Sequence, residues 1–498
     1  MSRLKHASPI AGDRLSRRLV TPGNKKWWTL AAVSFGLFMI MLDATVVNVA
    51  LPAIRDSLHM KLAGLEWVVA GYALTFAAFM LTGGKLADQF GRRLVFTAGL
   101  TVFTGASLAC GLAPNGTVLI GARVVQGLGA ALMNPATLSI ITATFPARQR
   151  GTAIGIWAGV SSLALSIGPL VGGLLTEHAN WNWIFFINVP TGLAAVLLAP
   201  VLIEESRDTS IERRSDLPGL ALSSIGLFAL TYGFIEATTY GWASGQIIGA
   251  FLAAAAALAA FITLEMRQRV PMLDMSLFRN RTFSGANTAM FFIGLAMLGT
   301  FFYVSLYMQN VLGYSPVEAG AAFLPLTLLL SLVAPQAGKL SDRLGSRALI
   351  TVGMTLLAIM LGNFSRLGAH ASFWALLPGL CAGGIGMGMS MTPTTAAAMR
   401  SVPVAKAGIG SAVLNSMRQV GGSLGIAVMG TIVASGVSAS LRVGDPPKIA
   451  YLHGFHHALD IAALLALAGA IVALAAIRKT PQQTKKEPAA EPAPSIDG

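Results

Sequence analysis

The segment GKLADQFGRR, from Gly84 to Arg93, is repeated later in the chain as GKLSDRLGSR, from Gly338 to Arg347. Each copy is a short polar segment between two long apolar runs. Glycine permits a tight turn, and an acid beside a helix N-terminus can cap it while holding an arginine. The copies fall in the same register when the chain is divided into two halves of six apolar runs each. The repeat therefore predicts two related halves.

The apolar runs around these segments are long enough to cross a membrane. Of the 498 residues, 54% are hydrophobic and 11% are charged, whereas about a quarter of the residues of a soluble protein are charged. At 1.5 Å per residue, a run of about twenty residues spans about 30 Å of hydrocarbon. Alternating segments suited to a β-barrel are absent, so the fold class is an all-α polytopic membrane protein. We predict fourteen spans, at residues 28–50, 65–86, 94–113, 117–137, 152–175, 184–203, 217–236, 247–265, 286–308, 319–340, 348–366, 373–395, 407–435 and 457–477.

The register of the repeat also predicts the domain organisation. The first copy joins spans 2 and 3 and the second joins spans 10 and 11, so spans 7 and 8 are an insertion between the halves. The expected segments are an N-terminal tail at 1–27, a six-helix half at 28–203, a loop at 204–216, two inserted helices at 217–265, a loop at 266–285, a second six-helix half at 286–477 and a disordered tail at 478–498.

The formal net charge of +14 is distributed unevenly across the membrane. Of the 35 Lys and Arg residues, 28 fall in the tails and loops on the side of the N-terminus, and five fall in the loops on the other side. This bias predicts that both termini are cytoplasmic and that the protein lies in the inner, or plasma, membrane. The basic excess orients the chain, so it does not indicate nucleic-acid binding.

Other chemistry is not indicated by the sequence. Cys110 and Cys381 lie in spans of opposite halves, so neither a disulfide framework nor a redox pair is expected. Both Gly-Lys pairs are followed by Leu, which excludes a phosphate-binding P-loop and a nucleotide-driven pump. We expect no cofactor and no enzyme activity.

Four stretches together carry a resemblance to a known family. They are LDATVVNVALP from Leu42 to Pro52, the Gly84 segment, RVVQGLGAA from Arg123 to Ala131, and GPLVGG from Gly168 to Gly173. From about residue 28 to 477, the chain resembles the major facilitators, and specifically their fourteen-span drug:proton antiporters, which export multiple drugs and quaternary ammonium compounds. The resemblance implies a major facilitator fold with two additional central helices and a role in antibiotic resistance.

Asp43 and Arg123 are the candidate proton-coupling pair. Asp43 is expected to be the only acid well inside a span, and a buried ionisable group needs a cavity or a partner. Arg123 lies at a similar depth in span 4, so the two can meet if both spans face one cavity, as the resemblance implies. The alternative is a permanent ion pair that only fixes two helices.

Two further sets of residues concern conformational change. The resemblance implies that the repeated loops latch the two halves on the cytoplasmic side, and that a glycine motif in span 5 marks antiporters. Ala164 departs from that motif, because glycine is usual there. The latch residues are Gly84, Asp88, Gly91, Arg92, Arg93, Asp342, Arg343 and Arg347, and the antiporter-motif residues are Gly155, Gly168, Pro169, Gly172 and Gly173.

Candidate substrate-binding residues come from spans 1, 9 and 13. Aromatic and methionine side chains crowd span 9 and suit promiscuous, sometimes cationic, ligands, although lipid or neighbouring helices must cover much of any such helix. Arg418 lies near the midplane of span 13, where it either lines the cavity or bonds a neighbouring carbonyl. The candidates are Asp43, Phe291, Phe292, Tyr303, Tyr307 and Arg418.

The histidine-rich segment before the last span is a weaker candidate for a site. His453, His456, His457 and Asp460 would have the spacing of metal ligands if the helix of span 14 began early. We interpret the segment as an interfacial loop and expect no metal site.

The sequence thus predicts a secondary active exporter of amphiphilic, cationic small molecules, driven by proton antiport with alternating access. A dedicated exporter of one metabolite, antibiotic or lipid would share these features, and a proton-coupled importer would share the halves and loops. A non-transporting receptor or scaffold is disfavoured, because it needs neither buried Asp43 nor Arg123. The expected partners are the substrate, protons and lipid; nothing in the sequence supports a periplasmic adaptor protein.

Overall fold

The structure is a computed structural model, and it describes residues 24–207, 216–268, 271, 273–403 and 406–478. The N-terminal tail at 1–27, expected to be cytoplasmic, and the tail at 478–498, expected to be cytoplasmic and disordered, lie outside these residues apart from a few at their inner ends.

Long apolar stretches with few charges form the helices, and fourteen of the helical segments in the described part are long and apolar enough to cross a membrane. Most helices extend beyond the predicted spans, because the polar residues at their ends continue the same backbone hydrogen bonding. Two spans are each built from two consecutive helices, Trp183–Leu202 and Pro316–Ser341. The helices are α2 (Lys25–Leu58), α3 (Leu62–Phe90), α4 (Arg92–Gly111), α5 (Gly116–Thr144), α6 (Ala147–His178), α7 (Trp183–Phe186), α8 (Asn188–Leu202), α9 (Leu217–Tyr240), α10 (Gly245–Arg267), the 3-10 helix η1 (Met275–Arg279), α11 (Arg281–Asn310), α12 (Pro316–Ala322), α13 (Leu324–Leu344), α14 (Ser346–Phe364), α15 (Phe373–Arg400), α16 (Ala407–Arg442) and α17 (Pro447–Ala476).

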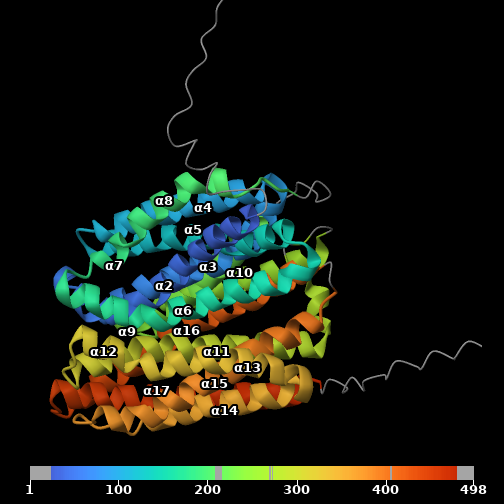
Figure 1. Ribbon diagram of the computed structural model, residues 1–498. Helices are drawn as coiled ribbons and strands as arrows, with labels where there is room; N and C mark the ends of the chain where they lie inside the picture. Colours follow the sequence, from blue (N-terminus) through green and yellow to red (C-terminus); the bar gives the residue numbers. More distant parts are fainter. Residues whose placement is uncertain (1–23, 208–215, 269–270, 272, 404–405, 479–498) are drawn as a thin grey trace, which may run out of the picture.

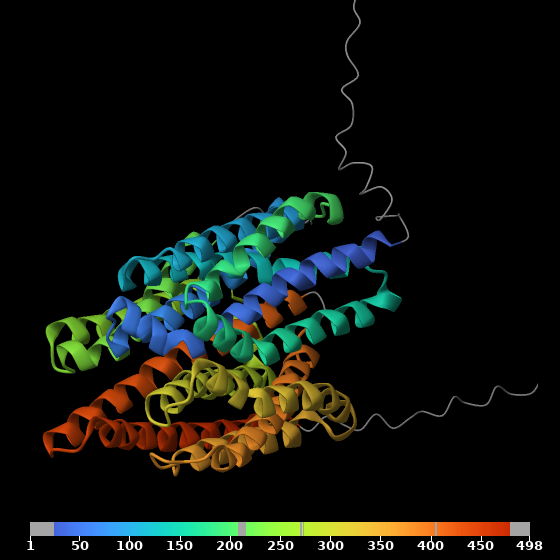
Figure 2. The same ribbon diagram turned by 60° about the vertical axis from the view of Figure 1, so that its left-hand side comes forward.

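The helices form two bundles. Helices α2 to α8 form the first half, drawn in blue to green in Figure 1, and α11 to α17 form the second, drawn in yellow to red. The halves pack against each other through α3 with α16, α6 with α12 and α13, and α2 with α11. This is the expected arrangement of two six-helix halves. Figure 2 shows that the described chain begins and ends at the same face, which we call the terminal face.

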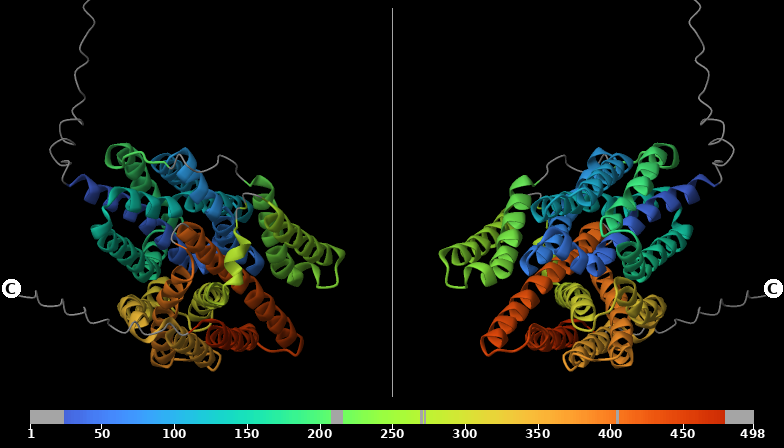
Figure 3. Two further views of the ribbon diagram at one scale, coloured as in Figure 1. Left: turned by 90° about the vertical axis from the view of Figure 1, so that its right-hand side faces the viewer. Right: turned by 90° about the vertical axis from the view of Figure 1, so that its left-hand side faces the viewer.

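The inserted pair α9 and α10 lies to one side of the two bundles (Figure 3). Helix α9 packs against α3 of the first half and α16 of the second. Two hydrogen bonds fix it, from Trp67 Nε1 to Glu236 Oε1 at 3.2 Å and from Thr431 Oγ1 to the Phe234 carbonyl at 2.7 Å. The pair therefore spans the boundary between the halves on this side.

The repeated loops turn at equivalent glycines. Gly91 ends α3 with a φ of 125°, and Gly345 ends α13 with a φ of 82°. Side-chain-bearing residues rarely adopt this left-handed region, which explains why both copies of the repeat carry glycine at this place. Both turns lie at the terminal face, because α2 starts there and the spans alternate in direction.

Candidate functional site

Asp43 and Arg123 form an ion pair inside the first half. Arg123 Nη1 on α5 donates to Asp43 Oδ2 on α2 at 2.5 Å, and the two side chains are 0% and 1% exposed. Arg123 Nε also donates to the Val68 carbonyl on α3 at 3.1 Å, and the guanidinium lies 4.2 Å from the centre of the Tyr72 ring. The contact between the two predicted coupling residues is therefore present.

A shell of amides and a hydroxyl surrounds the pair. Gln126 Nε2 donates to Asp43 Oδ1 at 2.9 Å, and its Oε1 accepts from Arg123 Nη1 at 2.7 Å. Asn188 Nδ2 lies 3.4 Å from the same Asp43 oxygen and donates to Ser107 Oγ at 3.0 Å. Side chains from α2, α4, α5 and α8 thus meet at one buried polar cluster, which consists of Asp43, Arg123, Gln126, Asn188 and Ser107.

The two opposite charges in this polar cluster depend on each other. The ionised carboxylate and the guanidinium neutralise each other, as a buried pair must. A proton on Asp43 would leave Arg123 charged and unpaired in a low-dielectric interior, which costs several kcal/mol unless helices rearrange. The pair is therefore sensitive to the loss of either charge.

A small pocket lies between the halves, next to this polar cluster. Its volume is about 30 Å³, and α2, α3 and α6 line it from the first half and α11 and α16 from the second. Asp43 does not line the pocket, whereas the neighbouring residues Ala44 and Thr45 do. The lining residues are Met41, Ala44, Thr45, Asn48, Phe76, Leu165, Met297, Leu298, Phe301, Arg418 and Gln419.

Arg418 is the one charged residue among the described residues that line this pocket. No described group forms a hydrogen bond or ion pair with its side chain, and its Nε is buried without a partner. The sequence left open whether Arg418 lines a cavity or bonds a carbonyl, and the structure places it in the pocket.

The aromatic residues that we predicted on α11 lie elsewhere. Tyr307 Oη donates to the Gly368 carbonyl at 2.7 Å, and its ring stacks on Phe455. Phe291 and Phe292 contact each other edge to face, with centroids 5.6 Å apart. None of these three residues lines the pocket in this conformation. The α11 residues that line it are Met297, Leu298 and Phe301.

Three of the antiporter-motif glycines on α6 lie where a neighbouring helix approaches closely. A Cβ at Gly173 would collide with the Pro316 carbonyl of α12, and a Cβ at Gly172 would collide with α2. A Cβ at Gly168 would collide with Thr45, whereas nothing lies within 4 Å of one at Gly155. Glycines at these positions allow the neighbouring helices to approach closely.

Hydrogen bonds join the halves in the middle of the protein and at the face opposite the termini. At that face Ser305 Oγ donates to the Asn48 carbonyl and Gln309 Nε2 to the Val49 carbonyl, both at 2.9 Å. The Val317 N–H donates to Glu177 Oε2 at 2.9 Å. The structure therefore represents a state in which this face is closed.

Comparison with known proteins agrees with this architecture. The family model of the Major Facilitator Superfamily matches residues 33–426. The chain belongs to the Major Facilitator Superfamily. It is consequently a multi-pass membrane transporter and not an enzyme.

Several curated major facilitators are similar to this one in sequence. The tetracenomycin C resistance and export protein of Streptomyces glaucescens is 38% identical over 426 residues, which cover 84% of this chain and 77% of that one. The multidrug resistance protein Stp of Mycobacterium tuberculosis is 39% identical over 417 residues, covering 83% and 77%. Relatives of this transporter are thus resistance and export proteins.

Solved structures show the same fold. A bacterial homolog of the human lysosomal transporter Spinster, inward-facing and unoccupied, matches with a TM-score of 0.65 at 18% identity, covering 92% of this chain and 98% of that one. A transporter of the POT family in complex with 5-aminolevulinic acid also matches with a TM-score of 0.65, at 13% identity, covering 90% and 95%.

The latch loop of the first half of this major facilitator is tied to its own half. Arg92 Nε donates to Asp88 Oδ1 at 2.9 Å, and Glu205 accepts from the backbone N–H groups of Arg93 and Leu94 at 3.1 Å each. Glu205 thereby caps the N-terminus of α4, a role that its position in a polar loop did not predict. Arg93 also donates to two carbonyls at the end of α8.

The equivalent loop of the second half has a different hydrogen-bond network. Arg400 donates to the hydroxyls of Ser341 and Ser346, which flank the turn. Arg343 is exposed, and the side chain of Asp342 lies outside the described part of the chain. Nearby, Asp274 accepts hydrogen bonds from Lys406 and Ser276, which hold its pKa below the usual range.

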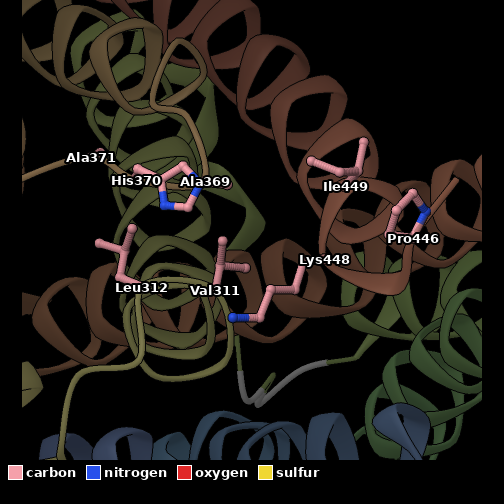
Figure 4. Close-up of a pocket in the computed structure, with 8 residues that line it drawn as sticks. All are labelled: Val311, Leu312, Ala369, His370, Ala371, Pro446, Lys448 and Ile449. Atoms are coloured by element: carbon pink, nitrogen blue, oxygen red, sulfur yellow. The ribbon is translucent and has the colours of Figure 1, made fainter.

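The histidine segment is helical, so our interpretation of it as an interfacial loop was wrong. Helix α17 begins at Pro447, and His453 and His456 bond Ser440 Oγ and the Leu367 carbonyl. Among the described residues, no group of three or more His, Cys, Asp or Glu residues is placed to hold a metal. A surface pocket of about 510 Å³ lies nearby (Figure 4); residues of three segments of the second half line it: Val311, Leu312, Ala369, His370, Ala371, Pro446, Lys448 and Ile449.

Sequence reasoning missed several members of the site. Gln126 follows Arg123 by three residues on one helix, a spacing that places both on the same face and could have identified it. Nothing in the sequence singles out Asn188 or Ser107. Glu66, the second residue of the predicted span 65–86, is only 3% exposed, so Asp43 is not the only buried acid in the spans.

Proposed function

We propose that this protein is a proton-driven exporter of amphiphilic small molecules that works by alternating access. The observation that carries the proposal is the fully buried pair of Asp43 and Arg123 within a hydrogen-bonded polar cluster. An intramembrane ion pair that cannot be protonated without rearrangement is a means of coupling protons to conformational change. The resistance and export functions in the relatives' names support the same direction of transport.

The orientation of the protein in the membrane is inferred from the distribution of its Lys and Arg residues. With the terminal face cytoplasmic in the inner membrane, the closed face is external, and the state described here would receive substrate from the cytoplasm. Protons then enter from outside when the protein is open outward, neutralise Asp43 and release Arg123. Return to the state described here and loss of the proton to the cytoplasm restore the ion pair.

The loops and the glycine motif act on the equilibrium between these states. We propose that the latch residues Gly84 to Arg93 and Gly338 to Arg347 hold the cytoplasmic side together when the external side opens. The antiporter-motif glycines from Gly168 to Gly173 allow the external side to close tightly against α2 and α12. Each set therefore favours one state, and turnover needs both.

The substrate binds between the halves, around the small pocket. Phe76, Met297 and Phe301 offer apolar and aromatic surface for flat amphiphiles, including the cations expected from the sequence. We retain Asp43, Phe291, Phe292, Tyr303 and Tyr307 as proposed contacts of the open states, because the halves move relative to each other.

Arg418 favours a second candidate. It is a positive charge with no described partner in the pocket, and such a charge is best satisfied by a carboxylate, phenolate or other acceptor on the ligand. A dedicated exporter of an acidic antibiotic or metabolite would use the same coupling cluster with this anchor.

Dye uptake into proteoliposomes tests the proposal and separates the two candidates. The lumen is made acidic, and uptake of the cationic xanthene dye tetramethylrhodamine ethyl ester is compared with that of the anionic carboxyfluorescein, with protein-free liposomes as the control. Uptake of the cation that depends on the proton gradient supports multidrug antiport, and uptake of the anion alone supports the second candidate. Equal uptake with and without the gradient contradicts proton antiport.

A further inference from the structure

A second buried acid lies at the contact between the halves, away from the Asp43 cluster. Glu66, in the first turns of α3, extends into the second half, where Tyr303 Oη of α11 lies 2.9 Å from its Oε1. Tyr303 is 0% exposed. A Cβ at Gly430 of α16 would collide with both Glu66 and Tyr303, so the two side chains fill the space that this glycine leaves.

The hydrogen bonds of Tyr303 indicate whether Glu66 is protonated. Tyr303 Oη also lies 3.1 Å from the Ile426 carbonyl, so one phenolic hydrogen faces two acceptors if Glu66 is ionised. A proton on Glu66 resolves the conflict, because the carboxyl then donates to Tyr303 and Tyr303 donates to Ile426. The observed distances therefore suit a neutral acid, with Glu66 Oε1 and Tyr303 Oη both satisfied.

The charged surroundings agree with a neutral Glu66. In the described part of the chain, no Lys, Arg or His forms an ion pair with it. Glu236 of α9, held by Trp67, is a second acid on the same side, so two ionised carboxylates here would repel each other. The other titratable groups facing this site are Tyr451 of α17, which donates to the Tyr303 carbonyl, and Arg55 of α2 beyond it.

We propose that Glu66 is a second proton-binding site and that its proton holds the two halves together at the external face. The inference rests on the proposed function for its sidedness and its link to transport. Glu66 and Tyr303 lie on opposite halves, so they separate when the external face opens and Glu66 meets external water. Glu66 then loses its proton to that water, and external acid returns the proton and favours closing.

Glu66 and Asp43 therefore have different roles. Asp43 has a permanent counter-charge and lies inside one half, whereas Glu66 has a phenol for a partner and bridges two halves. Glu66 exchanges protons with the external side only and carries no net charge across the membrane. It makes the external gate sensitive to external pH, closing it in acid and releasing it as the pH rises.

Infrared spectroscopy of the purified protein in lipid nanodiscs tests the protonation without any need for transport. At neutral pH, well above the ordinary titration range of a glutamate near pH 4.3, the wild type should show the carbonyl stretch of a protonated carboxylic acid. The band should persist in Asp43→Asn and be lost in Glu66→Gln. A band that is unchanged in Glu66→Gln would overturn the proposal, whatever the transport assays show.

A distance measurement tests the gate. Spin labels are placed at Thr117→Cys and His370→Cys, exposed residues at the external ends of opposite halves, in a background with Cys110 and Cys381 replaced by Ala. In the wild type, the short-distance population should fall as pH rises. Glu66→Gln, whose amide can still donate to Tyr303, should keep that population at every pH. The matched control Glu236→Gln should retain the pH response; a full wild-type pH response in Glu66→Gln would overturn the gate.

Discussion

Arg123 Nη1 donates to Asp43 Oδ2 across 2.5 Å, and neither side chain reaches solvent. Removing one charge of this pair leaves the other buried and unpaired, which costs about 3–5 kcal/mol. We therefore expect Asp43→Asn to lower the thermal stability of the purified protein clearly. Adding Arg123→Gln should recover most of that loss, because no buried charge then remains.

The same double variant separates coupling from structure. It should be folded, as judged by its melting temperature, but should not accumulate dye in response to a proton gradient. Gradient-driven uptake by the double variant at the wild-type rate would assign the pair a purely structural role.

The close approach of α6 to α12 should be sensitive to a single methyl group. Gly173→Ala places a Cβ against the Pro316 carbonyl, so it should oppose closure of the external face and reduce transport about tenfold or more, a change of about 1.4 kcal/mol. Gly159→Ala is the matched control on the same helix, because nothing lies within 4 Å of its added Cβ. Equal transport rates in the two variants would show that the contact does not limit the cycle.

The effect of Arg418→Gln on binding should show whether the substrate is an anion or a cation. Arg418→Gln should weaken binding of an acidic substrate about tenfold or more, and should leave a cation unaffected or bound more tightly. Binding is measured by dye fluorescence titration with carboxyfluorescein and tetramethylrhodamine ethyl ester. Arg442→Gln, an exposed arginine on the same helix, is the control and should change neither. If the wild type binds carboxyfluorescein and Arg418→Gln binds it equally well, Arg418 does not anchor the substrate.

The latch should affect turnover more than stability. Asp88→Asn removes the ion pair with Arg92, which is partly exposed to solvent and contributes at most about 1 kcal/mol. We expect a small change in melting temperature and a several-fold loss of transport. Asp56→Asn removes a more exposed pair, with Arg55, and should transport normally. Normal transport by a well-folded Asp88→Asn protein would contradict the proposed role of this loop as a latch.

Much of the fold could be predicted because the membrane restricts what a sequence can do. Fourteen apolar runs and the glycines of the repeated loop follow from length and backbone freedom. The contact of Asp43 with Arg123 could be predicted from the cost of buried charge only together with the family resemblance, which implies that spans 1 and 4 face one cavity. The lining of the pocket could not be predicted in the same way. Helix α11 is apolar on all sides, so the sequence gives no face that distinguishes Phe301 from Phe291.

The partners of buried polar residues were harder still to predict. Depth in the membrane can be counted along a span, but the rotation of one helix against another cannot. Glu66 is the second residue of the predicted span 65–86, and its contact with Tyr303 of α11 is evident only from the structure, in which α3 packs against α16. The contact of Asn188, from α8, with Asp43 also depends on how the helices are rotated against each other, so the sequence did not indicate it.

Proton release on ligand binding tests the central claim most directly. The detergent-solubilised protein is mixed, in weakly buffered solution containing a pH indicator, with whichever xanthene dye the wild type binds. The account predicts that binding releases protons from the wild type, because binding favours the ionised Asp43, and that Asp43→Asn binds dye without releasing them. An undiminished proton signal in Asp43→Asn would contradict the account and place the coupling site elsewhere.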